Sequence, residues 1–416
     1  MVSNVENGPS AKALFTAALR KHETGDSRTA LRILFDLFRV HPFHEEGLKA
    51  AAKLSESLGS LQEAELFSAV ADRPEDPQAL YDLGYAFVES GLPEIAAAYL
   101  EACADRRPED HLVHYELAFA RFRSGRYASA TELLKPLAAD PNLPGAESFA
   151  SRLLLVESLV HQGEIDHARR IFDLLEPAGA SAHAESQLDA LSGLLARAAL
   201  FPSTADLARR DWHFIEHAGV LLLEARARES ALPTGTLVPQ SLAAILLRLA
   251  ALLRSLGLEP REIQHLTPRS RPLAVALARM MGASCSTFQQ NTEHRTLVVL
   301  HEPGEAEPFL RDLRNHEEGV HLFALYADPR RRYALHPEIV GLFGGALELP
   351  WTAPAEAAAQ SVVAALPALE QDAAELDLLC RYYAPLRELL VLGHPDRHPV
   401  RRVLTPLRRH PGPDAP

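Results

Sequence analysis

One stretch of the sequence combines residue types that could hold an anion. Residues His265 to Pro272 follow a short apolar segment and precede an amphipathic one. Ser270 is the predicted N-cap of a helix, and Arg269 and Arg271 flank it. Free backbone amides at a helix start, beside two guanidinium groups, suit a phosphate or a carboxylate. An ordinary capped helix start with two solvated arginines would explain the same residues.

Three further polar residues follow predicted strands. His301 and Glu302 follow the apolar strand predicted over 296–300, and Asp328 follows the one predicted over 320–326. If these strands run parallel in an open sheet, these residues lie at its carboxyl edge, where ligands bind. Together with the stretch from residue 265 to 272 they form a candidate site for a small anionic or phosphorylated molecule.

Motifs of known catalytic chemistry are missing from the sequence. It contains no Walker phosphate loop, no dinucleotide-binding glycine motif, no nucleophile elbow and no zinc-protease motif. Residues 341–345 form a glycine-rich turn in this interpretation, without the lysine of a phosphate loop. The histidine pairs His213/His217 and His394/His398 lack a convincing third ligand. We therefore expect no catalytic residue, no cofactor and no metal, and an enzyme or ligand sensor is the alternative function.

Composition bounds the class of protein. The chain has 416 residues, of which 47% are hydrophobic and 23% charged, which is typical of a globular protein. Its formal net charge of −13 argues against general binding of nucleic acid. Three dispersed cysteines suit a reducing compartment, and two arginines interrupt the most apolar run, 242–258, which argues against membrane insertion. We expect a cytoplasmic protein.

Helical and strand patterns alternate in the second half of the chain, which favours an α/β domain with parallel strands. Residues 211–226 fit either strands or one buried helix. The other segments are predicted helices over 241–256, 273–281 and 308–315, and predicted strands over 263–266, 296–300 and 320–326.

A glycine, an alanine five residues later and a proline near the end of the unit recur in the first half. The turn glycines lie 32 to 38 residues apart. Helix-breaking glycines at this spacing predict repeated helix pairs, which bury their apolar faces only by stacking. The glycines are Gly25, Gly59, Gly91, Gly125 and Gly163; the alanines are Ala30, Ala64, Ala96, Ala130 and Ala168; the prolines are Pro42, Pro74, Pro108, Pro141 and Pro177.

The clearest unit, Gln78 to Pro108, resembles the tetratricopeptide repeat (TPR) family in its length and in its small residues Gly84 and Ala96. The resemblance covers residues 10–177 and implies an α-solenoid of five helix pairs. The expected protein is thus multidomain, α and α/β. Its expected parts are 10–177 helical repeats, 178–204 capping helix and linker, 205–350 α/β domain, 351–395 helical segment and 396–416 disordered basic tail.

The resemblance also implies a function. In TPR proteins the first helix of each pair lines a concave groove that binds a peptide or another protein, which favours an interaction scaffold. Aromatic side chains give contact area at low entropic cost, and two lysines favour an acidic segment. The alternative is that the tyrosines only pack neighbouring helices. By register the groove residues are Lys49, Lys53, Tyr81, Tyr85, Tyr115 and Phe119.

Overall fold

The computed structural model describes residues 10–175, 182–204, 207–223, 232–289, 295–314, 320–329, 331, 333, 335–345, 347–351, 354–367 and 373–390. These residues fall into two compact units, one up to residue 175 and one from residue 182 on. Each unit is described by itself. The predicted basic tail, 396–416, lies outside the described residues.

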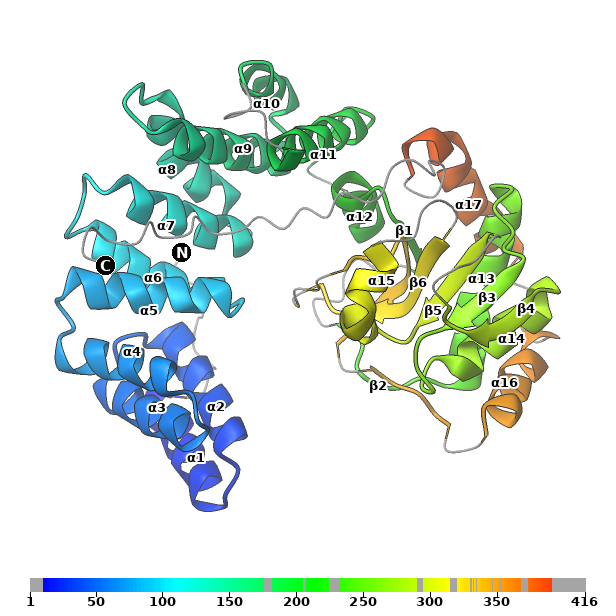
Figure 1. Ribbon diagram of the computed structural model, residues 1–416, viewed down its shortest axis with the longest axis horizontal. Helices are drawn as coiled ribbons and strands as arrows, with labels where there is room; N and C mark the ends of the chain where they lie inside the picture. The colour runs from blue at the N-terminus through cyan, green and yellow to red at the C-terminus, as the bar shows by residue number, and fades with distance from the viewer. Residues whose placement is uncertain are drawn as a thin grey trace, which may run out of the picture. The chain divides into compact units, whose positions relative to one another are not determined.

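Helices that pair along the chain build the N-terminal unit. Within residues 10–175 every connection between helices is short, and each helix packs against the next (Figure 1). This arrangement confirms the five helix pairs predicted from the repeats. The helices are α1 (Ala11–Glu23), α2 (Ser27–Val40), α3 (Glu45–Ser57), α4 (Leu61–Asp72), α5 (Pro77–Glu89), α6 (Pro93–Ala104), α7 (His111–Arg123), α8 (Tyr127–Ala139), α9 (Gly145–His161) and α10 (Ile165–Phe172).

The five turn glycines separate the two helices of each pair. All five have a left-handed backbone, with φ between +72° and +87°. A residue with a Cβ is strained in that conformation, so glycine is the residue that ends the first helix of each pair. The sequence repeat therefore marks a backbone conformation, and the predicted register is confirmed.

Small residues allow the helices of a pair to approach closely. A Cβ added to Gly84 of α5 would lie 2.8 Å from Cγ of Leu100 and 3.3 Å from Cβ of Tyr99, both on α6. Ala96 of α6 is fully buried. The α5–α6 contact thus depends on the absence of side-chain volume at these positions.

A parallel sheet of six strands forms the centre of the C-terminal unit, in the order β1-β7-β6-β5-β3-β4, and every pairing is parallel. The strands are β1 (Val220–Leu223), β3 (Glu262–His265), β4 (Ser284–Thr287), β5 (Thr296–Leu300), β6 (Val320–Ala327) and β7 (Ile339–Phe343); β2 (Gly235–Thr236) pairs separately with β8 (Leu347–Glu348).

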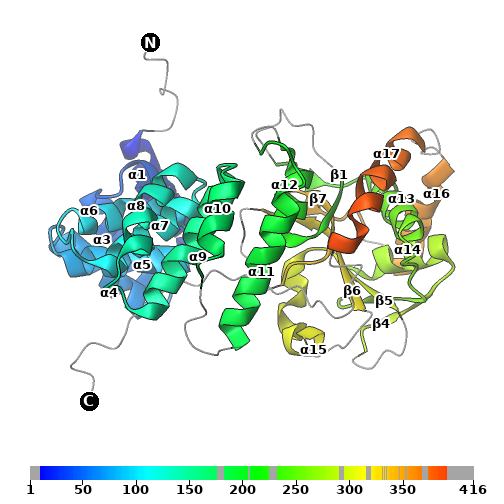
Figure 2. The same ribbon diagram turned by 90° about the horizontal axis from the view of Figure 1, so that it is seen from above.

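Helices cover both faces of this sheet. Figures 1 and 2 show α14 and α16 on one side and α15 on the other. The side chains of Val298 and Leu300 pack with Ala306 and Leu313, which belong to the segment containing η1 and α15. The elements are α11 (Ala182–Ala198), α12 (Arg209–His217), α13 (Pro239–Ser255), α14 (Arg271–Met281), η1 (Pro303–Phe309), α15 (Leu310–Arg314), α16 (Ala355–Ala364), α17 (Ala373–Tyr383) and η3 (Ala384–Leu389).

Most predicted elements of this half agree with the structure, and several points differ. The sequence did not predict the strands β4 and β7. In the segment 211–226, which fitted either strands or a helix, residues 211–217 belong to α12 and residues 220–223 form β1. The helix predicted over 308–315 is the end of a 3₁₀ segment followed by one short helix, because Pro308 has no amide to donate within a longer α-helix. Gly341 belongs to β7 and not to a turn. A Cβ there would meet the Leu325 carbonyl oxygen at 2.3 Å, so glycine lets β7 approach its neighbours.

The linker range 178–204 contains α11, which contacts α12 and groups with the C-terminal unit. Its role as a cap stays a prediction.

We expect Gly84→Ala to destabilise the protein, although alanine favours a helix by about 1 kcal/mol over glycine. The added methyl group would overpack the α5–α6 contact, at a cost of roughly 1–3 kcal/mol. Denaturant unfolding measures the difference. Gly145→Ala is the control, because nothing lies within 4 Å of a Cβ at this first residue of α9. Equal or higher stability of the Gly84 variant would contradict the proposed packing.

A buried histidine predicts acid sensitivity of the C-terminal unit. His213 of α12 is 4% exposed. Burial lowers its pKa to about 3, and the charge of His336 contributes a smaller part of this shift. The unfolded chain binds this proton below pH ~6.5 and the folded chain does not, so stability falls as the pH drops from about 6.5 towards 3. At pH ~5.5 the expected loss is on the order of 1 kcal/mol. Melting temperatures between pH 7.5 and 5 measure it.

We expect His213→Gln to flatten this pH dependence, whatever its effect on stability at neutral pH. His167→Gln, at an exposed position beside Glu164, serves as the control. An unchanged pH slope in the His213 variant would contradict the assignment.

Candidate functional site

The carboxyl edge of the parallel sheet gathers polar residues from three neighbouring strands. In the register of β3 and β5, His265 lies opposite Val299. Thr267 lies two residues after His265, and His301 lies two residues after Val299. Both residues therefore follow the ends of β3 and β5 at the same height along the strands. Asp328 follows β6, which is the next strand beyond β5. The prediction that these strand ends share one edge is confirmed.

One carboxylate links the loops that follow β3 and β5. Glu305 accepts a hydrogen bond from Thr267 Oγ1 at 3.0 Å and another from the His301 backbone amide at 2.9 Å. Its pKa is raised by burial, which the two hydrogen bonds partly offset. Glu305 thus holds both loops in a fixed relation to each other.

His301 is fully buried at this edge, and its ring lies 5.0 Å from the Tyr326 ring in an edge-on arrangement. Within the described part of the chain, neither ring nitrogen makes a hydrogen bond of ordinary geometry, and the backbone of Leu347 is the polar group beside the ring. Burial, with the charge of Arg269 second, lowers the pKa of His301 to about 4. The imidazole is therefore neutral at pH 7 and presents one donor and one acceptor.

Glu302 is the second carboxylate of this edge. Its Oε2 accepts hydrogen bonds from the Tyr326 hydroxyl at 3.0 Å and from Arg331 at 3.1 Å. Burial, and to a smaller extent the charge of Glu302, raises the pKa of Tyr326 to about 12, so the phenol keeps its proton and donates the hydrogen bond. The backbone amide of Asp328 donates to the Tyr333 hydroxyl at 2.9 Å.

The structure separates the predicted anion-binding residues. Arg269 is exposed and interacts electrostatically with His301 and Glu305. Ser270 is buried, and its hydroxyl donates to the Thr267 carbonyl at 3.2 Å, so it faces its own turn. Arg271 pairs with Glu356 of α16 at 2.6 Å, which directs it away from Arg269.

Sequence reasoning did not single out Thr267, Glu305 or Tyr326. The acidic residue four positions after His301 was a weak signal, because only the sheet brings it beside the loop after β3.

The six predicted groove residues differ in exposure. Lys49 and Lys53 of α3 are exposed, and Lys49 pairs with Glu45 one turn earlier at 2.5 Å. Tyr85 is half-buried and stacks on Tyr81, with ring centroids 6.0 Å apart. The remaining aromatic side chains are buried: Tyr81 at 3%, Tyr115 at 4% and Phe119 at 2% exposure. This burial favours the packing interpretation for those three, and a shared groove stays a prediction.

Two buried carboxylates accompany the aromatic residues. Glu116 of α7 is fully buried and Glu157 of α9 is 4% exposed. Burial first, and then these two carboxylates, raise the pKa of Tyr115. Both carboxyl groups therefore lie buried near the phenol of Tyr115.

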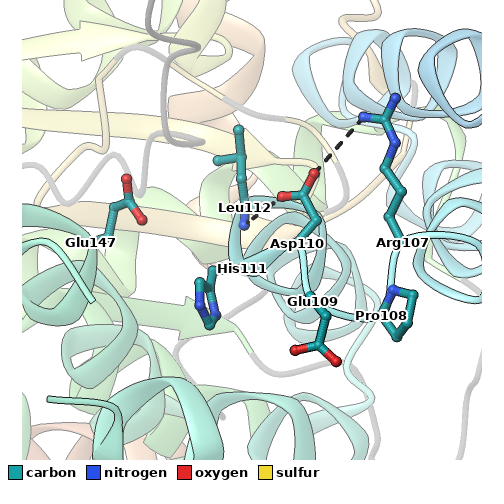
Figure 3. Close-up of a pocket in the computed structure, with 7 residues that line it drawn as sticks. All are labelled: Arg107, Pro108, Glu109, Asp110, His111, Leu112 and Glu147. Carbon is teal, nitrogen blue, oxygen red and sulfur yellow. Dashed lines mark hydrogen bonds and ion pairs between the residues drawn. The ribbon is translucent and has the colours of Figure 1, made fainter. Parts of the chain in front are cut away.

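A surface hollow of about 660 Å³ in the N-terminal unit has a structural explanation. It is lined by the loop between α6 and α7 and by Glu147 of α9 (Figure 3). Asp110 accepts hydrogen bonds from the amides of Leu112 at 3.1 Å and Val113 at 3.3 Å, which caps α7, and Arg107 lies 3.9 Å from its carboxylate. These side chains stabilise a helix start.

The described residues contain no group of three His, Cys, Asp or Glu side chains arranged to hold a metal ion. None of their helices combines the length and hydropathy needed to cross a bilayer.

Comparison with known proteins gave only structural neighbours. No family model and no curated protein matches the sequence. MamA from Desulfovibrio magneticus RS-1 is 22% identical, covering 40% of this chain and 94% of its own, with a TM-score of 0.26. Pseudomonas aeruginosa PilF is 20% identical; the match covers 45% of this chain and 83% of PilF, with a TM-score of 0.27. The TPR protein TTC0263 of Thermus thermophilus is 20% identical; the match covers 46% of this chain and 100% of TTC0263, with a TM-score of 0.25.

The fold of the N-terminal unit is assigned from its own repeated helix pairs. Each pair turns at a left-handed glycine. The alanine five residues later is buried in four of the five pairs, and Ala64 is partly exposed. Residues 10–175 are a helical repeat array of the TPR type.

Proposed function

We propose that the N-terminal unit is a protein-interaction scaffold whose concave face binds a segment of a partner protein. One observation supports this proposal above others. The first helices of successive pairs contact one another directly, α5 with α7 and α7 with α9. Side chains on these helices therefore form one continuous face on which an extended segment could lie.

The exposed lysines of α3 favour an acidic segment in the partner. Lys49 and Lys53 place positive charge on the surface of α3, and an acidic stretch suits this region. Tyr85 of α5 is half-buried and offers an aromatic surface at low entropic cost.

We assign this function to the cytoplasm, because the three cysteines are free and dispersed, as is usual in a reducing compartment. Cys285 is exposed, so an oxidising compartment would leave its thiol open to oxidation.

We expect Tyr85→Ala to weaken partner capture in a pull-down from native lysate, because truncating a central aromatic contact typically costs about 2 kcal/mol or more. Lys53→Glu should weaken capture mainly at low salt, since exposed charges act over distances that salt screens. The matched controls are Glu65→Ala on α4 and Lys135→Glu on α8, both on second helices. Capture reduced equally by the controls would place the partner elsewhere.

A further inference from the structure

The strand order of the C-terminal unit defines a topological switch point. From β3 the chain continues outward to β4, whereas from β5 it continues in the opposite direction through β6 to β7. Parallel crossovers are right-handed, so successive connections in opposite directions place their helices on opposite faces of the sheet. The loops after β3 and β5 therefore diverge where these two strands lie side by side. In open α/β sheets, ligands bind outside the carboxyl ends of the strands at this point.

The two loops at this point are held together. Glu305 accepts hydrogen bonds from Thr267 after β3 and from the His301 amide after β5. The start of α14, an eleven-residue helix, follows directly after the first loop. Fixed positions of groups from separate elements reduce the entropic cost of binding a ligand.

An incompletely satisfied buried side chain distinguishes this edge from an ordinary loop pair. His301 is fully buried, and the backbone of Leu347 is the polar group beside its ring. This group can serve only one ring nitrogen, so at least one nitrogen has no hydrogen-bond partner among the described residues. Burial of such a group is costly unless it gains a partner. It stands against Tyr326, at the ends of β5 and β6, and near the charge of Arg269.

The cationic group at this edge is also available. Arg269 is exposed and makes no ion pair with the described residues, whereas its neighbour Arg271 is paired with Glu356. The first amides of a helix lack intrahelical partners, and the positive end of the helix dipole favours an anion there. In α14 the second residue, Pro272, has no amide hydrogen, so the amides of Arg271 and Leu273 are the ones concerned. Arg269 and the start of α14 together suit a phosphate group.

We propose that this switch-point site binds a phosphorylated sugar, either free or as part of a nucleotide. The phosphate lies at the start of α14 beside Arg269. The sugar hydroxyls donate to Glu302, beside the buried, neutral imidazole of His301. Carboxylates accept about four hydrogen bonds each, and Glu302 uses part of this capacity for Tyr326 and Arg331.

The local charges permit this arrangement. Glu302 is balanced by Arg331 at 3.1 Å. Glu305 already accepts two hydrogen bonds within the protein, and its charge also interacts with Arg269. A bound phosphate would therefore share the charge of Arg269 with Glu305.

The two arginines flanking Ser270 give a sharp test. Titration calorimetry of the full chain would use four probes: ribose 5-phosphate, ADP, inorganic phosphate and ribose. We expect binding of ribose 5-phosphate or ADP, and the stronger of the two identifies the source of the sugar phosphate. Arg269→Gln should weaken that binding about tenfold or more, because it removes a charge-assisted contact. Arg271→Gln, the matched control, should leave it unchanged.

Three results would overturn the proposal. The first is no binding of either sugar phosphate. The second is binding of inorganic phosphate as tight as that of the sugar phosphates, which would show an anion site without sugar recognition. The third is an equal effect of the two arginine variants. Because both arginines are exposed, neither variant is expected to disturb folding. The test is independent of the solenoid, so its failure leaves the scaffold proposal standing.

Discussion

A parallel sheet must be covered on both faces, and the C-terminal unit is organised by this requirement. Its central strands β5 and β6 are largely apolar because helices pack on either side, with α14 and α16 on one face and η1 with α15 on the other. Covering both faces forces the chain to change direction between β3 and β5. The loops that carry Thr267 and His301 meet as a result, and Glu305 connects them. The arrangement of polar groups at this edge thus follows from how the sheet is buried.

The N-terminal unit obeys a different constraint, because each helix pair buries its apolar face only against its neighbours. Small side chains are needed where the helices approach, as at Gly84 and Ala96, and glycine is needed at the left-handed turns. These demands repeat in every pair and leave a regular trace in the sequence. The side chains on the remaining face are packed to different degrees: in the same register Lys53 is exposed, Tyr85 is half-buried and Phe119 is buried.

Local signals account for most of what was predicted. The turn glycines, the apolar strands over 296–300 and 320–326 and the helix start at Ser270 all depend on neighbouring residues. Elements with weak local signals were missed. The strand β4, Ser284–Thr287, is short and polar at an edge of the sheet, and β7 contains a glycine required by close packing. Likewise, Arg269 and Arg271 look equivalent in the sequence, but packing of α16 supplies Glu356 to only one of them.

The sequence by itself determined the repeat array and the alternation of helices and strands, because helix breaking, capping and hydrophobic periodicity act over a few residues. Only the tertiary structure decided the strand order, the partners of each charged group and which histidine is buried. Thr267 and Glu305 are separated by 38 residues, and their hydrogen bond exists because β3 and β5 pair side by side. Strand pairing and burial depend on contacts between distant segments, and no short stretch of sequence encodes them.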